Sequence, residues 1–208
     1  MNKLSLPALM LSVASFALLG CQPQQPVTRP AAPAELSEQS ERSDSPTPAA
    51  SNSASTKVEM MQVDFAGFEE QVKKHAGKLV VVDVWSTGCP PCMKEYPNLV
   101  ALSTRWPERV ACLSYNVDYI GQKSKPVESY LPKVGGFLEK QKSTSVINLI
   151  SSEADSDVFE KLEIASIPVV MLFGKDGKLL KKFTEANSGE DGLTYEGDIL
   201  PAIESALK

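Results

Sequence analysis

The residues that could carry chemistry in this chain are two cysteines separated by two prolines, Cys89-Pro90-Pro91-Cys92. Cysteine thiolates are nucleophiles and metal ligands, so a pair at this spacing either forms a reversible disulfide or supplies half of a zinc site. A structural zinc ion takes four ligands, usually from two such pairs. The rest of the chain offers only Cys21, Cys112 and a single histidine, His75. We therefore interpret the pair as redox-active and expect no metal.

The elements on either side of the motif indicate a role for each cysteine. Residues 79–85 form a run of β-branched and aromatic residues, which is typical of a strand buried on both faces. A helical stretch follows the motif and reaches about Trp106. Cys89 therefore precedes a helix, where the helix dipole and the free N–H groups favour a thiolate. We predict that Cys89 is the exposed nucleophile and that Cys92 is the buried thiol that releases the product.

Strands and helices alternate along the rest of the chain from residue 58. The patterns predict strands at 58–63, 79–85, 110–117, 145–150, 168–173 and 179–183, and helices at 65–75, 90–106, 127–140, 155–162 and from about 198. A turn signal, Gly174-Lys175-Asp176-Gly177, joins the last two strands into a hairpin. This order predicts an α/β fold in which helices flank a central mixed β-sheet.

The N-terminal residues carry a targeting signal. A single early charge, Lys3, precedes a mostly apolar run from Leu4 to Leu19 that is short for a membrane span, which is typical of a secretory signal peptide over residues 1–20. Leu18-Leu19-Gly20-Cys21 resembles the bacterial lipobox, in which the cysteine is lipidated. We expect a lipid on Cys21 that anchors the protein to a membrane. The alternative is an uncleaved signal anchor in which Cys21 is incidental.

Composition separates a tether from a globular head and excludes one class of partner. Residues 21–57 are dominated by Pro, Ala, Ser, Gln and Glu, and such a segment buries too little apolar surface to fold, so we predict a disordered tether. The net charge of -5 argues against a nucleic-acid partner, because phosphate binding needs basic surface. We predict a lipid-anchored protein on the extracytoplasmic, periplasmic side of a bacterial membrane, with its globular domain over residues 58–208.

Several ordered motifs together resemble the thioredoxin superfamily. The run from Val82 to Cys92 is similar to its active-site strand and motif, with Trp85 four residues before the nucleophile. Pro97 matches the proline of its active-site helix. Asn116-Val117-Asp118 resembles the end of its third strand, and Ser166-Ile167-Pro168 resembles its cis-proline segment. The resemblance covers roughly residues 58–208 and implies a thioredoxin-like fold.

Two further features resemble the membrane-tethered TlpA/ResA-like group of that superfamily. The chain between Asp118 and Ala165 is longer than in a minimal thioredoxin, which implies a helix and strand inserted after the third strand. The residues after the motif, Met93 to Pro97, are also similar to that group. The chain departs from the pattern at Gly88, where an aromatic residue is common before the nucleophile, and this leaves Cys89 more open.

Asp83 is the polar residue of the buried 79–85 strand. Burying a charged carboxylate is costly, so we expect the pKa of Asp83 to be raised. The resemblance implies that Asp83 lies beneath Cys92 and takes its proton. The alternative is a hydrated aspartate at an edge that only ends the buried run. A lysine often accompanies this acid on the third strand, and Ser114 takes its place here.

The resemblance also implies the residues that bind substrate, namely Trp85, Gly88, Ile167 and Pro168. A cis bond between Ile167 and Pro168 would turn the backbone of Ile167 toward Cys89, so that an extended substrate could pair with it beside the disulfide.

Together these features predict a protein disulfide reductase that acts by thiol–disulfide exchange. Its substrates would be the disulfides of exported proteins, including those of cytochrome c maturation, and a membrane protein would donate electrons. No cofactor is implied. The direction toward reduction follows from the TlpA/ResA resemblance alone.

Two alternatives remain open, and two others lack their sequence patterns. An oxidant or isomerase would use the same residues in the opposite direction. A non-catalytic tethered interaction module would not need both cysteines. Copper-delivery proteins of the Sco type need a CxxxC spacing and a later histidine, and peroxiredoxins need a Pro-x-x-x-Thr-x-x-Cys pattern; neither is present here.

Overall fold

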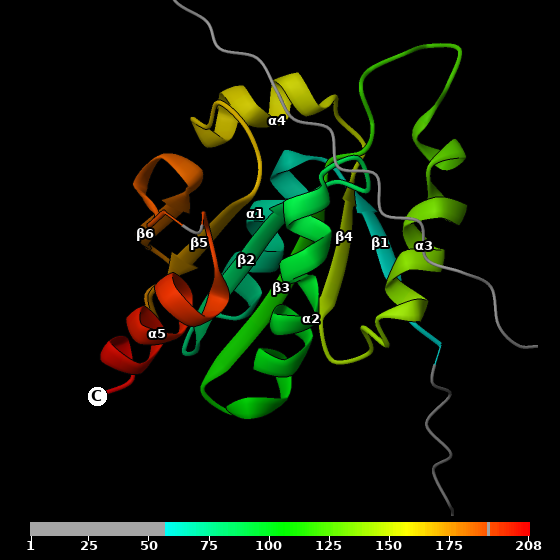
Figure 1. The fold of residues 1–208 in the computed structure, drawn as a ribbon. Helices are drawn as coiled ribbons and strands as arrows, with labels where there is room; N and C mark the ends of the chain where they lie inside the picture. Colours follow the sequence, from blue (N-terminus) through cyan, green and yellow to red (C-terminus); the bar gives the residue numbers. More distant parts are fainter. Residues whose placement is uncertain (1–56, 191) are drawn as a thin grey trace, which may run out of the picture. The chain divides into compact units, whose positions relative to one another are not determined.

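The computed structural model describes residues 57–190 and 192–208, and the structural statements below concern those residues. The predicted signal peptide, the expected lipid site Cys21 and nearly all of the predicted tether lie outside the described residues. Six strands form one sheet in the order β1-β4-β3-β2-β5-β6 (Figure 1). Their bounds are β1 (Met60–Val63), β2 (Leu79–Trp85), β3 (Val110–Asn116), β4 (Ile147–Ser151), β5 (Val169–Phe173) and β6 (Leu179–Thr184).

The sheet is mixed, which confirms the predicted architecture. Strands β1, β4, β3 and β2 run parallel to one another, whereas β5 pairs antiparallel with β2 and β6 pairs antiparallel with β5. Strand β2 is central, and all seven of its residues are buried. Its valine-rich run suits a strand covered on both faces, because β-branched side chains pack well on the pleated surface.

Helices cover both faces of the sheet and create two apolar cores (Figure 1). On one face, side chains of β2 pack with α2 (Pro90–Arg105), α3 (Leu131–Lys140) and α5 (Leu200–Ala206). On the other face they pack with α1 (Phe65–Lys74) and α4 (Asp155–Leu162). The first core contains Cys89 and Cys92, so the motif lies at the boundary between a packed interior and the surface.

Prolines explain two differences between the predicted and observed helices. The helix predicted at 127–140 is split into a 3₁₀ turn η1 (Val127–Ser129) and α3. Pro132 has no N–H to continue the first turn, but it fits the first turn of a new helix. Likewise α5 begins at Leu200, with Pro201 in its first turn, and a π turn η3 (Tyr195–Ile199) precedes it. A further 3₁₀ turn, η2 (Glu185–Asn187), follows β6 and was not predicted.

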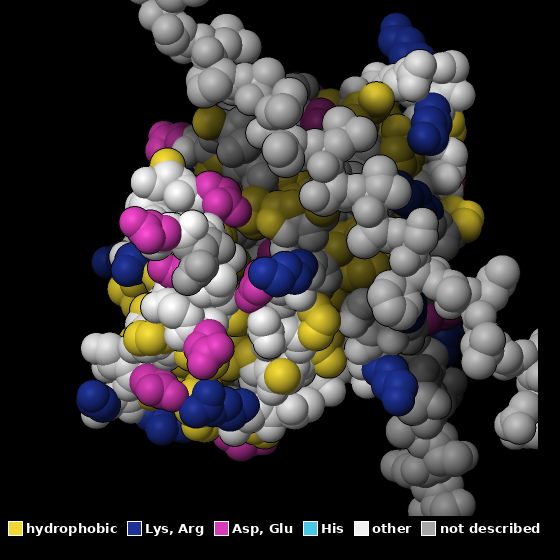
Figure 2. Space-filling view, in the orientation of Figure 1, with side chains coloured by type: hydrophobic (Ala, Val, Ile, Leu, Met, Phe, Trp, Pro, Cys, Tyr) yellow, Lys and Arg dark blue, Asp and Glu magenta, His cyan; other side chains and the backbone are white. Residues whose placement is uncertain are grey.

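Parts of the surface visible in Figure 2 mix charges of both signs. Lys, Arg, Asp and Glu side chains are interspersed on the part of that face around α5 (Figure 2). This mixture fits an acidic protein of net charge -5 that does not present a basic stripe there. Across the described ranges, none of the helices combines the length and apolar character needed to cross a membrane.

Candidate active site

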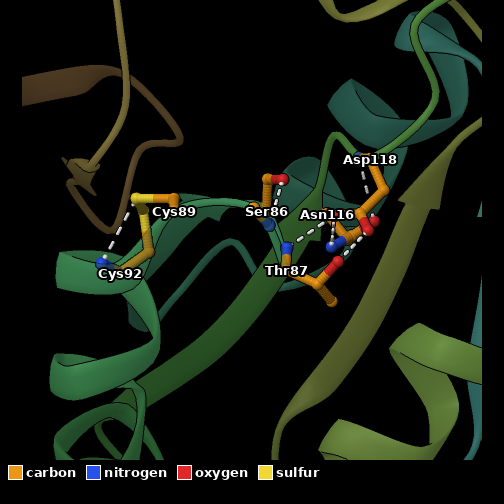
Figure 3. The surroundings of a disulfide bond; sticks show 7 residues. Ser86, Thr87, Cys89, Cys92, Asn116 and Asp118 are labelled. Carbon is orange, nitrogen blue, oxygen red and sulfur yellow. Dashed lines mark hydrogen bonds between the residues drawn. A yellow bond between two sulfur atoms is a disulfide. The ribbon is translucent and has the colours of Figure 1, made fainter.

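Cys89 and Cys92 are joined by a disulfide at the start of α2 (Figure 3). Cys89 is the N-cap residue, and its Sγ accepts a hydrogen bond from the backbone N–H of Cys92 at 3.3 Å. A sulfur in this position faces the helix N-terminus, which stabilises a thiolate once the disulfide is reduced.

Cys89 is more exposed than Cys92, as predicted. The prediction that Cys89 is an exposed residue is wrong, because both cysteines are buried in the oxidised protein. Cys89 is 8% exposed and Cys92 is 2% exposed. The disulfide and the hydrogen bond from Cys92 hold the Cys89 side chain back against α2, which explains its low exposure.

The loop before Cys89 is held by the end of β3. The backbone N–H of Thr87 donates to Asp118 Oδ1 at 2.6 Å, and the Thr87 hydroxyl donates to Asp118 Oδ2 (Figure 3). Asn116 Nδ2 donates to the same Asp118 Oδ1 at 3.0 Å, and Asn116 Oδ1 accepts from the Asp118 N–H at 3.1 Å. Asn116 and Asp118 are both buried, so their hydrogen bonds hold the loop at Thr87 in one position. From the sequence, Asp118 is only part of the segment that resembles the end of the third strand of thioredoxins, and the sequence predicts no role for it in the site.

Asp83 lies in the middle of β2 and is 3% exposed, which excludes the alternative of a hydrated aspartate at an edge. Burial raises the pKa of Asp83 from 3.8 to about 7. A hydrogen bond from Tyr195 opposes this shift, and the negative charge of Glu95 adds to it. A carboxyl group with this pKa can exchange a proton near neutral pH.

Two residues of this environment were missed in the sequence. The Tyr195 hydroxyl donates to Asp83 Oδ2 at 2.8 Å, and the Tyr195 backbone N–H donates to Glu95 Oε2 at 3.1 Å. Glu95 lies one helical turn after Cys92 on α2. Tyr195 lies in the π turn η3, far along the chain from Asp83, and π turns leave no periodic pattern to recognise.

Trp85 occupies the core rather than the surface. Its side chain is fully buried, its Nε1–H donates to Ser114 Oγ at 2.9 Å, and its ring lies 4.9 Å from that of Tyr96. The prediction that Trp85 contacts substrate is therefore wrong in this structure, because the packed aromatic cluster separates it from solvent. Trp85 instead supports the end of β2 from beneath the motif. Ser114 stands where the resemblance leads one to expect a lysine, and its hydroxyl oxygen accepts this hydrogen bond from Trp85.

A groove of about 440 Å³ lies beside Cys89. Gly88 and Ile167, two predicted substrate-binding residues, line it with Cys89 itself. Its other lining residues are Ser86, Pro90, Pro91, Val117, Asp118, Ile120, Asp155, Phe159, Ala165 and Ser166. Pro168 is buried next to the groove, and the Ile167–Pro168 peptide bond is cis. The groove beside Cys89 is thus lined by apolar residues and by two aspartates, Asp118 and Asp155.

Comparison with known proteins identifies the family. The profile of the family described as Redoxin matches residues 54–199. The chain belongs to the redoxin family. A relative named thiol-disulfide oxidoreductase ResA, from Geobacillus thermodenitrificans, is 25% identical over 138 residues, which cover 66% of this chain and 72% of the relative. The protein of that name from Geobacillus kaustophilus is 24% identical over the same shares of the two chains.

Solved structures are similar to this redoxin at low sequence identity. The exposed lipoprotein thioredoxin of Streptococcus pneumoniae is 17% identical, with a TM-score of 0.48 over 64% of this chain and 89% of that one. The thioredoxin domain of a thiol-disulfide oxidoreductase from Bacteroides vulgatus is 23% identical, with a TM-score of 0.47 over 65% of this chain and 84% of that one. The family match and the ResA relatives confirm the predicted thioredoxin-like, TlpA/ResA-like membership.

Cys112, the third cysteine in the described part of this redoxin, does not lie at a helix N-terminus as Cys89 does. Cys112 is 2% exposed in the middle of β3, and burial raises the pKa of its thiol to about 12. A thiol with that pKa is not a nucleophile near neutral pH. Across residues 57–190 and 192–208, no three His, Cys, Asp or Glu side chains are grouped so that they could hold a metal ion.

Proposed function

We propose that this redoxin is an extracytoplasmic protein disulfide reductase. The observation that carries the proposal is the Cys89–Cys92 disulfide at the N-terminus of α2, with a groove beside Cys89. Its substrates are the disulfides of exported proteins, and its family membership supports thiol–disulfide exchange as the reaction.

The reaction proceeds in two exchange steps. In the reduced protein the Cys89 thiolate attacks one sulfur of a substrate disulfide, and the other substrate sulfur leaves as a thiolate and takes a proton from water. The Cys92 sulfur then attacks Cys89, which forms the Cys89–Cys92 bond and releases the second substrate thiolate. Two electrons pass to the substrate, and a membrane electron donor returns the protein to its reduced form.

Asp83 is the proposed base of the second step. Cys92 must lose its proton in order to attack, and Asp83 is a buried carboxyl group whose pKa of about 7 suits it to accept that proton. Glu95 and Tyr195 connect the surroundings of Asp83 to the helix that carries Cys92. The contact that the second step requires is between Asp83 and the reduced thiol.

The groove is the proposed substrate site. An extended substrate segment would lie along Gly88 and Ile167, with the substrate sulfur at Cys89 and the backbone of Ile167 available for hydrogen bonding. Ile120 is 57% exposed and offers apolar contact at the side of the groove formed by the chain that follows β3. Trp85 has no direct part in this site because it is fully buried.

The proposed location rests on the N-terminal sequence. A signal peptide over residues 1–20, a lipid on Cys21 and the tether of residues 21–57 would hold the redoxin domain near the periplasmic side of a bacterial membrane. The TlpA/ResA resemblance supports the reducing direction. Disulfides formed by cysteines of exported proteins, such as the haem-binding cysteines of apocytochrome c, are the proposed substrates.

Equilibration of the Cys21→Ser chain with glutathione buffers, followed by thiol trapping of Cys89 and Cys92, tests the proposal. We expect a potential near that of thioredoxin, about -270 mV, rather than the value of about -120 mV of the oxidant DsbA. A value near the latter would make the protein an oxidant or isomerase. If the pair shows no reversible couple, the catalytic proposal fails and a non-catalytic interaction module remains. The matched control is Cys112→Ala, which leaves the pair intact.

A further inference from the structure

Asp83 has one hydrogen-bond donor among the described side chains, and that donor is Tyr195. The two residues are both nearly inaccessible, with exposed fractions of 3% for Asp83 and 2% for Tyr195. The bond from the phenol hydroxyl to Asp83 Oδ2 is 2.8 Å long. Because both groups are almost inaccessible to solvent, this hydroxyl provides the stabilisation that solvent would give an exposed carboxylate.

We infer that Tyr195 is a positioning residue of the exchange reaction, whose hydroxyl holds Asp83 in the ionised form that accepts the proton of Cys92. The inference rests on the proposed function, because it requires Asp83 to act as the base of the second exchange step. Tyr195 itself touches neither substrate nor sulfur in this role.

The other polar groups around Asp83 do not donate to it. From α2, Glu95 contributes a negative charge, and the Tyr96 hydroxyl bonds to Ser143 and Asn148. From β3, Cys112 is a neutral thiol, and Ser114 accepts the Trp85 indole N–H. The antiparallel neighbour of Asp83 on β5 is the apolar Val170. Within the described residues, stabilisation of the Asp83 anion therefore comes from the Tyr195 hydroxyl.

The C-terminal segment fixes the position of this hydroxyl. Tyr195 opens the π turn η3, and the Thr194 side chain accepts from the Gly197 N–H at 3.1 Å. The backbone N–H of Thr194 donates to Asp198 Oδ2 at 3.0 Å. The Tyr195 N–H also bonds to Glu95, so the same residue is attached to the active-site helix by its backbone and to β2 by its side chain.

The proton balance gives the expected effect. When Cys92 attacks Cys89, the bond from Cys89 to the substrate breaks, the substrate sulfur leaves with the electron pair, and the Cys92 proton passes to Asp83. Asp83 must be ionised before this transfer. Burial and the charge of Glu95 favour the protonated form, and the Tyr195 bond opposes them. Without the hydroxyl, Asp83 keeps its proton to higher pH and the release step slows near neutral pH.

The test is a single turnover of the reduced Cys21→Ser chain with a peptide disulfide that carries a fluorophore on each half. The attack by Cys89 and the release by Cys92 separate the two halves in successive phases, which are followed between pH 5 and pH 9 in stopped flow. In Tyr195→Phe we expect the midpoint of the release phase to move to higher pH. Well below the midpoint, release should be about tenfold or more slower, because a hydrogen bond to a charged group is lost. The attack phase should be unchanged.

Matched variants show whether Tyr195→Phe slows release through Asp83 or only by disturbing the packing of the core. Tyr130→Phe also removes a buried hydroxyl from the same core, one without a partner in the described part of the chain, and its profile should superimpose on that of the unchanged protein. In an Asp83→Asn background, Tyr195→Phe should no longer alter the pH dependence. An equal slowing by Tyr195→Phe with and without Asp83, or an unshifted midpoint, overturns the inference.

A second substitution keeps the test decisive if Tyr195→Phe does not fold. Site-specific fluorotyrosine at position 195 retains the ring and makes the hydroxyl a stronger donor, so the midpoint should move to lower pH. No shift would contradict the inference. Failure of the proposed function has a different signature, because neither phase would then appear in the unchanged protein.

Discussion

Burying a carboxyl group in the middle of β2 costs folding free energy whenever that group is ionised. This cost applies to Asp83, which is buried at the centre of the sheet. One hydrogen bond among the described side chains, from Tyr195, reduces the cost, and the negative charge of Glu95 increases it. A purely structural role would be filled better by an apolar residue at this position. The placement of Asp83 therefore supports the proposed proton transfer near neutral pH.

The cost at Asp83 gives a stability prediction with a definite sign. The pKa of Asp83 is about 7 in the folded chain against 3.8 for the ordinary group. The unfolded chain loses this proton first, so the contribution of Asp83 to stability is largest below pH 4 and is lost as the pH rises through about 7. A shift of about three pH units corresponds to about 4 kcal/mol.

Asp83→Asn removes this titration while keeping the size of the side chain. We expect the variant to gain stability relative to the unchanged protein as the pH rises from 4 to 8, by up to about 4 kcal/mol. Urea unfolding of the oxidised chains at both pH values measures the difference. Asp176→Asn, in the exposed hairpin turn, is the control and should show no such trend. A stability difference that is the same at both pH values would contradict the assignment of Asp83.

At the scale of elements, the junction between β2 and α2 depends on the end of β3. Thr87 is bound through both its N–H and its hydroxyl to Asp118, which Asn116 holds in turn. This arrangement fixes the loop immediately before Cys89, and hence the position of Cys89 beside the groove.

Asp118→Ala should therefore weaken both stability and exchange. The Thr87 and Asn116 donors lose their acceptor in a part-buried setting, which should cost about 1–3 kcal/mol. The rate of attack by Cys89 should fall as well, while the release step keeps its pH profile because Asp83 is untouched. Urea unfolding and the stopped-flow attack phase measure the two effects. Asp176→Ala is the control, since Asp176 lies in the exposed hairpin turn, where it accepts from the Lys178 N–H and pairs with the Lys178 ammonium. An attack rate equally reduced in both variants would exclude a specific role for Asp118.

Elements with a strong periodic or compositional pattern could be predicted from the sequence. The valine-rich run of β2 and the CxxC at the next helix located Cys89, Cys92 and Asp83, because these features are local in the chain. Tyr195 could not be located in this way, since its contact with Asp83 joins residues 112 positions apart through a π turn. The low exposure of Cys89 and of Trp85 also depends on tertiary packing, which local patterns do not contain.

At the scale of the whole molecule, the proposed function requires the redoxin domain to reach exported substrates and a membrane electron donor. A diffusing domain could meet both, but a lipid-anchored one is kept within reach of the membrane by its tether. Each buried methylene of an acyl chain contributes about 0.8 kcal/mol to membrane binding, so two or three chains on one cysteine give stable attachment. The proposed location therefore depends on the chemistry of a single residue, Cys21.

Cys21→Ser tests this dependence in the full chain produced in a bacterium. The unchanged protein should sediment with membranes and incorporate labelled palmitate, because the proposal places the lipid on the Cys21 thiol. The variant should lose the label. Once a protease that does not require Cys21 has removed its signal peptide, the variant should appear in the soluble extracytoplasmic fraction. Its Cys89–Cys92 exchange in solution should be unchanged, and Cys112→Ala should remain lipidated. Membrane association of an unlabelled wild-type chain would instead support an uncleaved signal anchor, and the redoxin domain would then be held at the membrane by the apolar run of residues 4–19 itself.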